Sequence, residues 1–134
     1  MERSFTREIG ALQEVFDFIA GILDSCRADS SSRYAISLAV EELFTNMVKY
    51  NPEGSGDITL SIARDGGRMI VTIVDRDVQP FDVTQTADVD TSLPLHERRV
   101  GGLGIHLVKQ IVDDLRYEYA DSCSTITIVK NLEP

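Results

Sequence analysis

The chain has 134 residues, of which 43% are apolar and 26% charged, and its 22 acidic residues outnumber its 13 basic residues. These values predict one soluble domain without a membrane span, because no apolar run approaches the roughly 18 to 20 residues that a span needs. The net charge of −9 argues against nucleic acid as a partner, because phosphodiester backbones are themselves anionic. The N-terminus has no apolar signal core, so we expect a cytoplasmic protein with two reduced thiols, Cys26 and Cys123.

Helical periodicity dominates the first fifty residues. Apolar side chains at helical spacing predict a helix over residues 8–25. A second helix is predicted to begin at a capping serine, Ser30, Ser31 or Ser32, and to run to about Lys49.

After the second predicted helix, the apolar residues recur with a period of two. Alternating and β-branched residues predict strands over 58–63 and 69–74, joined as an antiparallel hairpin by the glycines at 66 and 67. Residues 75–99 show no regular period, and a segment of this length is typical of a functional lid or of a disordered segment. A third helix, opening at the glycines of 101–104 and running to about Leu115, precedes strands over 116–120 and 125–129. This order predicts an α+β two-layer sandwich, with three helices covering one face of four or five strands.

The second helix carries a polar strip beside its apolar face. Glu42, Asn46 and Lys49 are three and four residues apart and so lie together on the helix surface. A carboxylate, an amide and an ammonium group in this arrangement are candidates for chemistry. An ordinary solvated helix face with an i, i+4 polar pair is the alternative.

Glycines mark the start of the third helix. The run Gly101, Gly102, Leu103 and Gly104 would leave backbone N–H groups free to bind an anion such as phosphate. A flexible hinge before the helix is the alternative interpretation. No Walker-type run ending in Gly-Lys-Ser/Thr occurs, which excludes a P-loop site.

Asp75 follows an apolar strand and is placed to accept a hydrogen bond from an exocyclic amine such as that of adenine. The alternative is an aspartate that only starts a turn. Thr127, in the last predicted strand, could add a hydroxyl nearby, although threonine is also an ordinary strand residue.

Three segments taken in order resemble the GHKL (histidine kinase-like) ATPase superfamily. They are ELFTN at 42–46, Asp75 after its apolar strand, and GGLGIHLV at 101–108. The resemblance covers about residues 33–130 and is nearest to the small bacterial anti-sigma factor serine/threonine kinases. It implies the Bergerat-type ATP-binding fold, with helices on one face of a mixed, mostly antiparallel sheet. One domain would then span 1–134, with an ATP lid at about 82–100.

The resemblance also implies a role for each matching residue. Asn46 matches the asparagine that binds Mg²⁺, Glu42 matches the general base, and Lys49 matches a basic position that contacts the phosphates. Asp75 matches the aspartate that binds adenine and Thr127 the threonine that supports it. The run 101–104, comprising Gly101, Gly102, Leu103 and Gly104, matches the phosphate-binding segment at the end of the lid.

Two functions follow from the resemblance. The first is a kinase that uses Mg²⁺ and ATP to phosphorylate a serine of a small STAS-type anti-sigma antagonist, as a homodimer that can also bind a sigma factor. The second is a nucleotide-binding partner-switching module with little or no kinase activity. Glu42 favours the first function. Asp77 favours the second, because the family usually has glycine two residues after the adenine aspartate.

Overall fold

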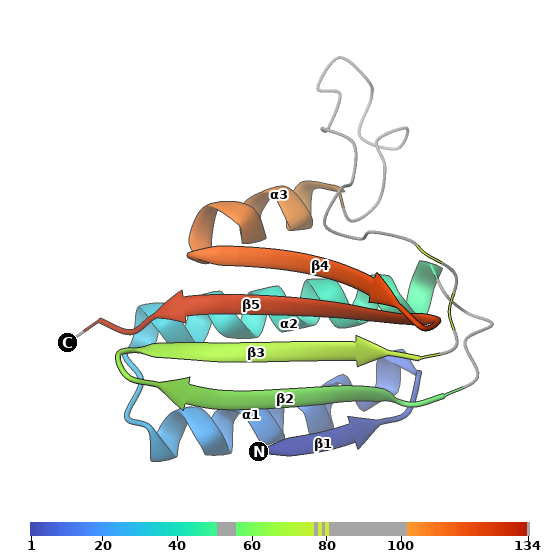
Figure 1. Ribbon diagram of the computed structural model, residues 1–134. Helices are drawn as coiled ribbons and strands as arrows, with labels where there is room; N and C mark the ends of the chain where they lie inside the picture. The colour runs from blue at the N-terminus through green and yellow to red at the C-terminus, as the bar shows by residue number, and fades with distance from the viewer. Residues whose placement is uncertain (51–55, 77, 79, 81–101, 134) are drawn as a thin grey trace.

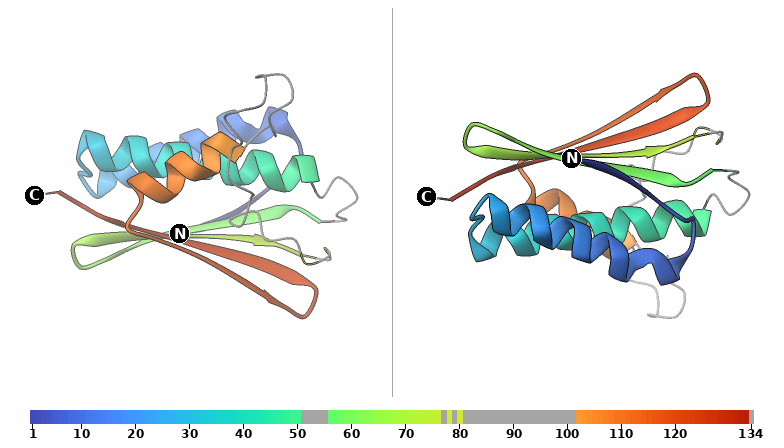
Figure 2. Two further views of the ribbon diagram at one scale, coloured as in Figure 1. Left: turned by 90° about the horizontal axis from the view of Figure 1, so that it is seen from above. Right: turned by 90° about the horizontal axis from the view of Figure 1, so that it is seen from below.

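The computed structural model describes residues 1–50, 56–76, 78, 80 and 102–133. A five-stranded sheet forms one layer, in the order β1-β2-β3-β5-β4, and three helices cover one of its faces (Figures 1 and 2). The strands are β1 (Glu2–Phe5), β2 (Ile58–Asp65), β3 (Arg68–Asp75), β4 (Asp114–Ala120) and β5 (Cys123–Asn131). The helices are α1 (Leu12–Ser25), preceded by the 3₁₀ turn η1 (Ile9–Ala11), α2 (Ser30–Tyr50) and α3 (Gly102–Ile111).

This architecture confirms the predicted α+β two-layer sandwich with its helices on one face. All four pairings between the described strands are antiparallel, so the parallel pair that a mixed sheet would contain is not found among them. Among the helices that the structure describes, none combines the length and apolar character that crossing a membrane requires.

β1 was not anticipated. Its four residues pair with Ile58–Ser61 of β2, and only Phe5 is buried, so the strand carries almost no apolar alternation. The β2–β3 turn was predicted correctly: Gly66 has a φ of 62°, which glycine adopts without strain.

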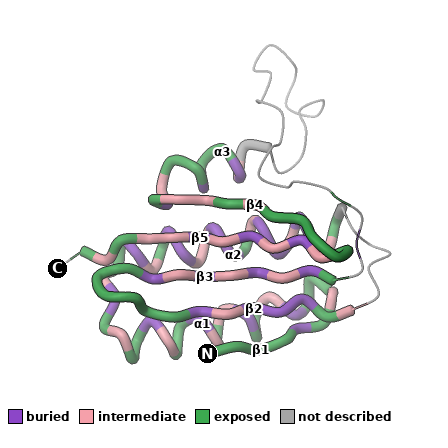
Figure 3. Tube along the Cα trace, viewed as in Figure 1, coloured by how far each residue is buried: buried purple, intermediate pink, exposed green. Residues whose placement is uncertain are grey.

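The core lies between the sheet and the helices, as the buried residues in Figure 3 show. Alternate residues of β3 point into it, namely Met69, Val71, Ile73 and Asp75. On α2, an apolar stripe faces the same core and is made of Ile36, Val40, Leu43, Phe44 and Met47. Asp75 is therefore a carboxylate at the end of an otherwise apolar row, which makes its partners important.

The third helix is shorter than predicted. α3 ends at Ile111, and Leu115, which was assigned to the helix, lies half-buried in β4 instead. The backbone N–H of Asp113 donates to the carbonyl of Val129 at 2.9 Å, and the Asp113 carboxylate accepts from the N–H of Asn131 at 2.6 Å. The backbone of Asp113 thus bonds to β5, and the Asp114 carboxylate accepts from the N–H of Leu115 at 3.0 Å, a local bond of the kind by which aspartate competes with helix formation.

The cap of α2 is Asp29 rather than a serine. Its carboxylate accepts hydrogen bonds from the backbone N–H of Ser32 at 2.9 Å and from the Ser32 hydroxyl at 2.7 Å. The N–H of Glu133 donates to the same carboxylate at 2.9 Å, so the cap also binds the C-terminal segment. The hydrogen bonds from Ser32 and Glu133 lower the pKa of Asp29 to about 2.

Asp29→Asn should therefore lower the thermal midpoint at pH 7 by a few degrees at most, because asparagine can still cap the helix but the ionised acceptor is lost. A folded-state pKa of about 2, below the ordinary aspartate value of 3.8, means that this stabilisation is complete above pH 3.8 and is lost as the pH falls through 2. Thermal melts between pH 2 and pH 7 should show the variant and the wild type converging at the acidic end. Asp57→Asn, at an exposed site, is the control; equal effects of the two variants at pH 7 would contradict the capping role.

Candidate functional site

The end of β3, the last turns of α2 and the start of α3 lie at the same end of the molecule (Figures 1 and 2). Two contacts bring them together. The carboxylate of Glu42 on α2 lies against Gly104 in the first turn of α3. The guanidinium of Arg7 binds both Asp75 of β3 and the carbonyl of Met47 on α2.

Glu42 projects from α2 toward the start of α3. A Cβ atom built on Gly104 would overlap the Glu42 carboxylate, so glycine is the residue that allows this approach. Burial raises the pKa of Glu42, and the neighbouring Glu41 carboxylate raises it further. Glu42 is therefore a partly desolvated carboxylate with an increased affinity for a proton, next to the start of a helix.

Asn46 lies one turn further along the same side of α2. It is only 2% exposed, and its Nδ2 group has no hydrogen-bond partner among the described residues. A buried donor without a partner costs free energy unless a ligand or water supplies an acceptor. Lys49, in the last turn, is exposed. Exposure thus differs along the predicted polar strip: Asn46 is buried, Glu42 is half-buried and Lys49 is exposed.

Asp75 is engaged by a residue that the sequence did not single out. Its Oδ1 pairs with Nη2 of Arg7, and its Oδ2 accepts from Nη1 of Arg7 at 3.2 Å. The side chain of Asp75 is 0% exposed and that of Arg7 is 8% exposed. The two residues are 68 positions apart, and no local pattern marks Arg7, so only the tertiary structure could reveal the pair.

The prediction for Thr127 is corrected by the register of the sheet. Thr127 pairs with Thr72, and both lie on the face of the sheet away from the helices, whereas Asp75 faces the helices. The residue opposite Asp75 is Ser124, which is 3% exposed and whose Oγ has no partner among the described residues. The alternation of Ser124 with Ile126 and Ile128 could have placed Ser124 on the buried face of β5, but the register opposite Asp75 comes from the structure.

Part of the predicted site lies outside the described residues. Gly101, Asp77 and the predicted lid at about 82–100 belong to this part. Gly102 and Leu103 form the beginning of α3, so the helix starts within the predicted glycine run. In the described part of the chain, no three or more His, Cys, Asp or Glu side chains form a group that could hold a metal ion.

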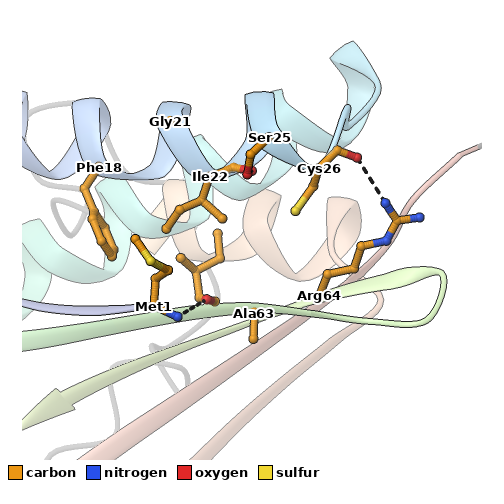
Figure 4. Close-up of a pocket in the computed structure, with 9 residues that line it drawn as sticks. Met1, Phe18, Gly21, Ile22, Ser25, Cys26, Ala63 and Arg64 are labelled. Carbon is orange, nitrogen blue, oxygen red and sulfur yellow. Dashed lines mark hydrogen bonds between the residues drawn. The ribbon is translucent and has the colours of Figure 1, made fainter.

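A separate cavity of about 490 Å³ lies between α1 and the far end of β2 (Figure 4). It is lined by side chains such as Phe18, Ile22 and Cys26, and Arg64 at its rim donates to the carbonyl of Cys26 at 3.1 Å. None of the predicted site residues lines this cavity. Asp75 pairs with Ile58, at the opposite end of β2, so the cavity is distinct from the Glu42 and Asp75 region.

Comparison with known proteins identifies relatives of the chain. Two proteins named serine-protein kinase RsbW, from Listeria monocytogenes serovar 1/2a and serotype 4a, are 26% and 25% identical to it over 104 residues. These matches cover 68% of this chain and 61% of each relative, so the chain spans about three-fifths of their length.

Two solved structures share the fold. The RsbU and RsbW domains of Rv1364c from Mycobacterium tuberculosis superpose with a TM-score of 0.71 at 19% identity, covering 100% of this chain and 33% of that one. The SiaB–SiaC complex from Pseudomonas aeruginosa gives a TM-score of 0.69 at 17% identity, covering 96% of this chain and 88% of that one.

The histidine kinase-like ATPase domain family matches residues 5–130, which include every described element of the site. The match covers nearly the whole sheet and all three helices, in agreement with the fold of the solved neighbours. This chain belongs to the histidine kinase-like ATPase domain family.

Proposed function

We propose that this chain is a serine/threonine protein kinase of the anti-sigma factor type, which transfers the γ-phosphoryl group of ATP to a serine of a small antagonist protein. The observation that carries the proposal is the contact between Glu42 and Gly104. It brings a carboxylate of raised pKa to the start of α3, where free backbone N–H groups favour phosphate. Family membership and the likeness to serine-protein kinases RsbW support the same function.

The residues present fit a nucleotide with its magnesium ion. Asn46 offers a buried amide whose Nδ2 lacks a partner among the described residues, so acceptor atoms of a ligand would satisfy it. Its carbonyl oxygen is a hard ligand of the kind that Mg²⁺ takes together with phosphate oxygens. When bound, Mg²⁺ would supply neutralisation of the phosphate charge. Lys49 and the run 101–104 are the proposed phosphate contacts, and Asp75 is the proposed adenine contact.

Glu42 is the proposed general base. It would accept the proton of the attacking serine hydroxyl as the oxygen forms its bond to the γ-phosphorus. A carboxylate with a raised pKa is a stronger base than one in water, provided that it remains ionised at the working pH. Partial burial of Glu42 thus increases its basicity at the position where the substrate hydroxyl would arrive.

The partner is proposed to be a small STAS-type antagonist. SiaB, a structural neighbour of this chain, was solved in a complex with SiaC, which supports a protein partner for this fold. The net charge of −9 favours a partner with a basic contact surface. Sigma-factor binding, a homodimer, a cytoplasmic location and a single domain with a lid at about 82–100 complete the proposal and rest on the family resemblance.

A partner-switching module with little catalysis is the second candidate, and Asp77 favours it. An aspartate where the family usually has glycine adds charge and bulk beside the nucleotide. Incubation with γ-labelled ATP and candidate antagonists distinguishes the two functions, because only the kinase transfers label. Calorimetry with ATP, ADP and GTP then shows whether the second function retains nucleotide binding.

Glu42→Gln should keep ATP affinity and lose phosphoryl transfer by roughly 100-fold or more, because the base is removed. It should also raise the thermal midpoint at neutral pH. A raised folded-state pKa means that the ionised carboxylate destabilises the folded chain above that pKa, and that stability increases as the pH falls through it. Label transfer, calorimetry and thermal melts measure the three effects. Glu118→Gln, at an exposed position on β4, is the control, and full transfer by Glu42→Gln would exclude the base role.

Asn46→Ala should weaken ATP binding by roughly tenfold or more when Mg²⁺ is present, because an interaction with a charged ligand is lost. In the presence of a chelator the loss should be smaller, because only the hydrogen bond from Nδ2 to the ligand then remains to be lost. Calorimetry with and without Mg²⁺ measures this difference, and Thr45→Ala, one residue away on the same helix, is the control. If the ATP affinity of a folded Asn46→Ala variant depended on Mg²⁺ as that of the wild type does, Asn46 would not be the magnesium-binding residue.

Gly104→Ala tests the contact that carries the proposal. The added Cβ would displace the Glu42 carboxylate, and a misplaced base should slow phosphoryl transfer by roughly 100-fold. Stability should not fall much, because the carboxylate is a flexible group and alanine favours a helix by about 1 kcal/mol over glycine.

Gly21→Ala is the matched control, since no atom lies within 4 Å of a Cβ built at this helical glycine. Both variants should melt at or above the wild-type temperature, and only Gly104→Ala should lose label transfer. A Gly104→Ala protein with normal transfer would show that the contact has no part in catalysis.

A further inference from the structure

The pairing of Arg7 with Asp75 covers the carboxylate that the proposed function assigns to the nucleotide base. Both Asp75 oxygens contact the guanidinium, and the Asp75 side chain has no exposed surface. An exocyclic amine needs access to one of these oxygens to donate a hydrogen bond. The base and the arginine in its observed position therefore compete for the same group.

The position of Arg7 explains how it reaches Asp75. In the sheet, Phe5 pairs with Ile58, and Ile58 pairs with Asp75, so the end of β1 lies two strands away from the aspartate. Arg7 comes two residues after Phe5, where the chain turns toward η1, and its side chain crosses to the helix side of the sheet. There it also donates from Nη1 to the carbonyl of Met47 at 3.4 Å.

The energetics of a buried ion pair allow a ligand to replace Arg7 as the partner of Asp75. Attraction between two buried charges is largely offset by the cost of removing both from water. A ligand that offers Asp75 a new donor, and lets the guanidinium return toward solvent, therefore replaces one partner of the carboxylate with another and does not leave it without one. The carbonyl of Met47 gives Arg7 one acceptor that does not depend on Asp75.

We propose that Arg7 is a gate on the base-binding aspartate, and that its guanidinium must leave Asp75 before a nucleotide base can bind there. The proposal rests on the proposed function, in which Asp75 accepts from adenine. A binding-competent state that is only partly populated weakens the apparent affinity by its population. Arg7 therefore sets how tightly and how fast this chain binds ATP.

The test compares ATP binding by wild type and Arg7→Gln, which removes the charge. If the open state makes up about a tenth of the wild-type population, Arg7→Gln should bind ATP roughly tenfold more tightly. Stopped-flow mixing with a fluorescent ATP analogue should place this gain in the association rate and leave the dissociation rate nearly unchanged. Arg7→Lys, which retains the charge with fewer donors, should fall between the two.

Arg3→Gln is the matched control. Arg3 lies on β1 with half of its side chain exposed, and its nearest acidic partner, Glu14, is 3.9 Å away. The variant makes the same change in net charge four residues from Arg7 without touching Asp75. Arg3→Gln should bind ATP with the affinity of the wild type. If its ATP affinity increased as much as that of Arg7→Gln, the change in net charge alone would explain the effect.

Arg7→Gln leaves Asp75 without its cation and could fail to fold, so a second measurement uses the wild type. With ¹⁵N-labelled arginine, and Arg7→Lys for assignment, the Arg7 side-chain signal should shift when ATP saturates the protein. If the Arg7 signal does not change, or if a folded Arg7 variant binds ATP with equal or weaker affinity, the proposal that Arg7 is a gate is wrong. The ion pair between Arg7 and Asp75 would then have a structural role only. Absence of ATP binding by wild type and all variants would instead refute the proposed function, and the gate with it.

Discussion

The burial of one apolar stripe of α2 is the constraint on which the site depends. Leu43, Phe44 and Met47 must face the sheet, and this fixes the rotation of the helix about its axis. Glu42, which lies beside that stripe, is then directed toward α3, and both Glu42 and Asn46 are removed from water in part or almost completely. The hydrophobic effect thus positions polar groups that would otherwise remain solvated, and it is strong enough to offset the cost of burying them.

That cost is concentrated at one end of the sheet. The raised pKa of Glu42 and the unmatched polar atoms of Asn46 and Ser124 are each unfavourable in the described structure. Ser124 lies opposite Asp75 in the sheet, and Asn46 belongs to the last turns of α2, at the same end of the molecule. Away from this end, contacts such as the Asp29 cap satisfy their donors and acceptors. Among the described residues, the unmatched polar atoms of Asn46 and Ser124 leave this end of the sheet poised to bind a polar ligand.

The sequence predicts the elements that are determined by residues close together in the chain. It misses those that depend on residues far away in the chain. Three helices, four strands and the Glu42 strip follow from periodicity and spacing. β1 has no apolar alternation and exists because the open edge of β2 accepts it, and Leu115 looks helical until β5 supplies its partners. Thr127 was chosen from its place in the last predicted strand and from the family resemblance, whereas the register selects Ser124. Arg7 could not be predicted, because its importance comes from a residue 68 positions away.

The unpredicted strand and the unpredicted arginine belong to one arrangement. β1 anchors the chain at the sheet edge through its pairing with β2, and Arg7 lies just beyond that ladder, before η1. In this connection the N–H of Glu8 donates to the carbonyl of Thr6 at 2.8 Å, a local bond that does not involve the sheet. The Arg7 side chain can therefore leave Asp75 without unpairing β1 or displacing the core. Opening of the proposed base site by Arg7 then requires a change of side-chain rotamer and no local unfolding. Of these two processes, side-chain motion is the faster.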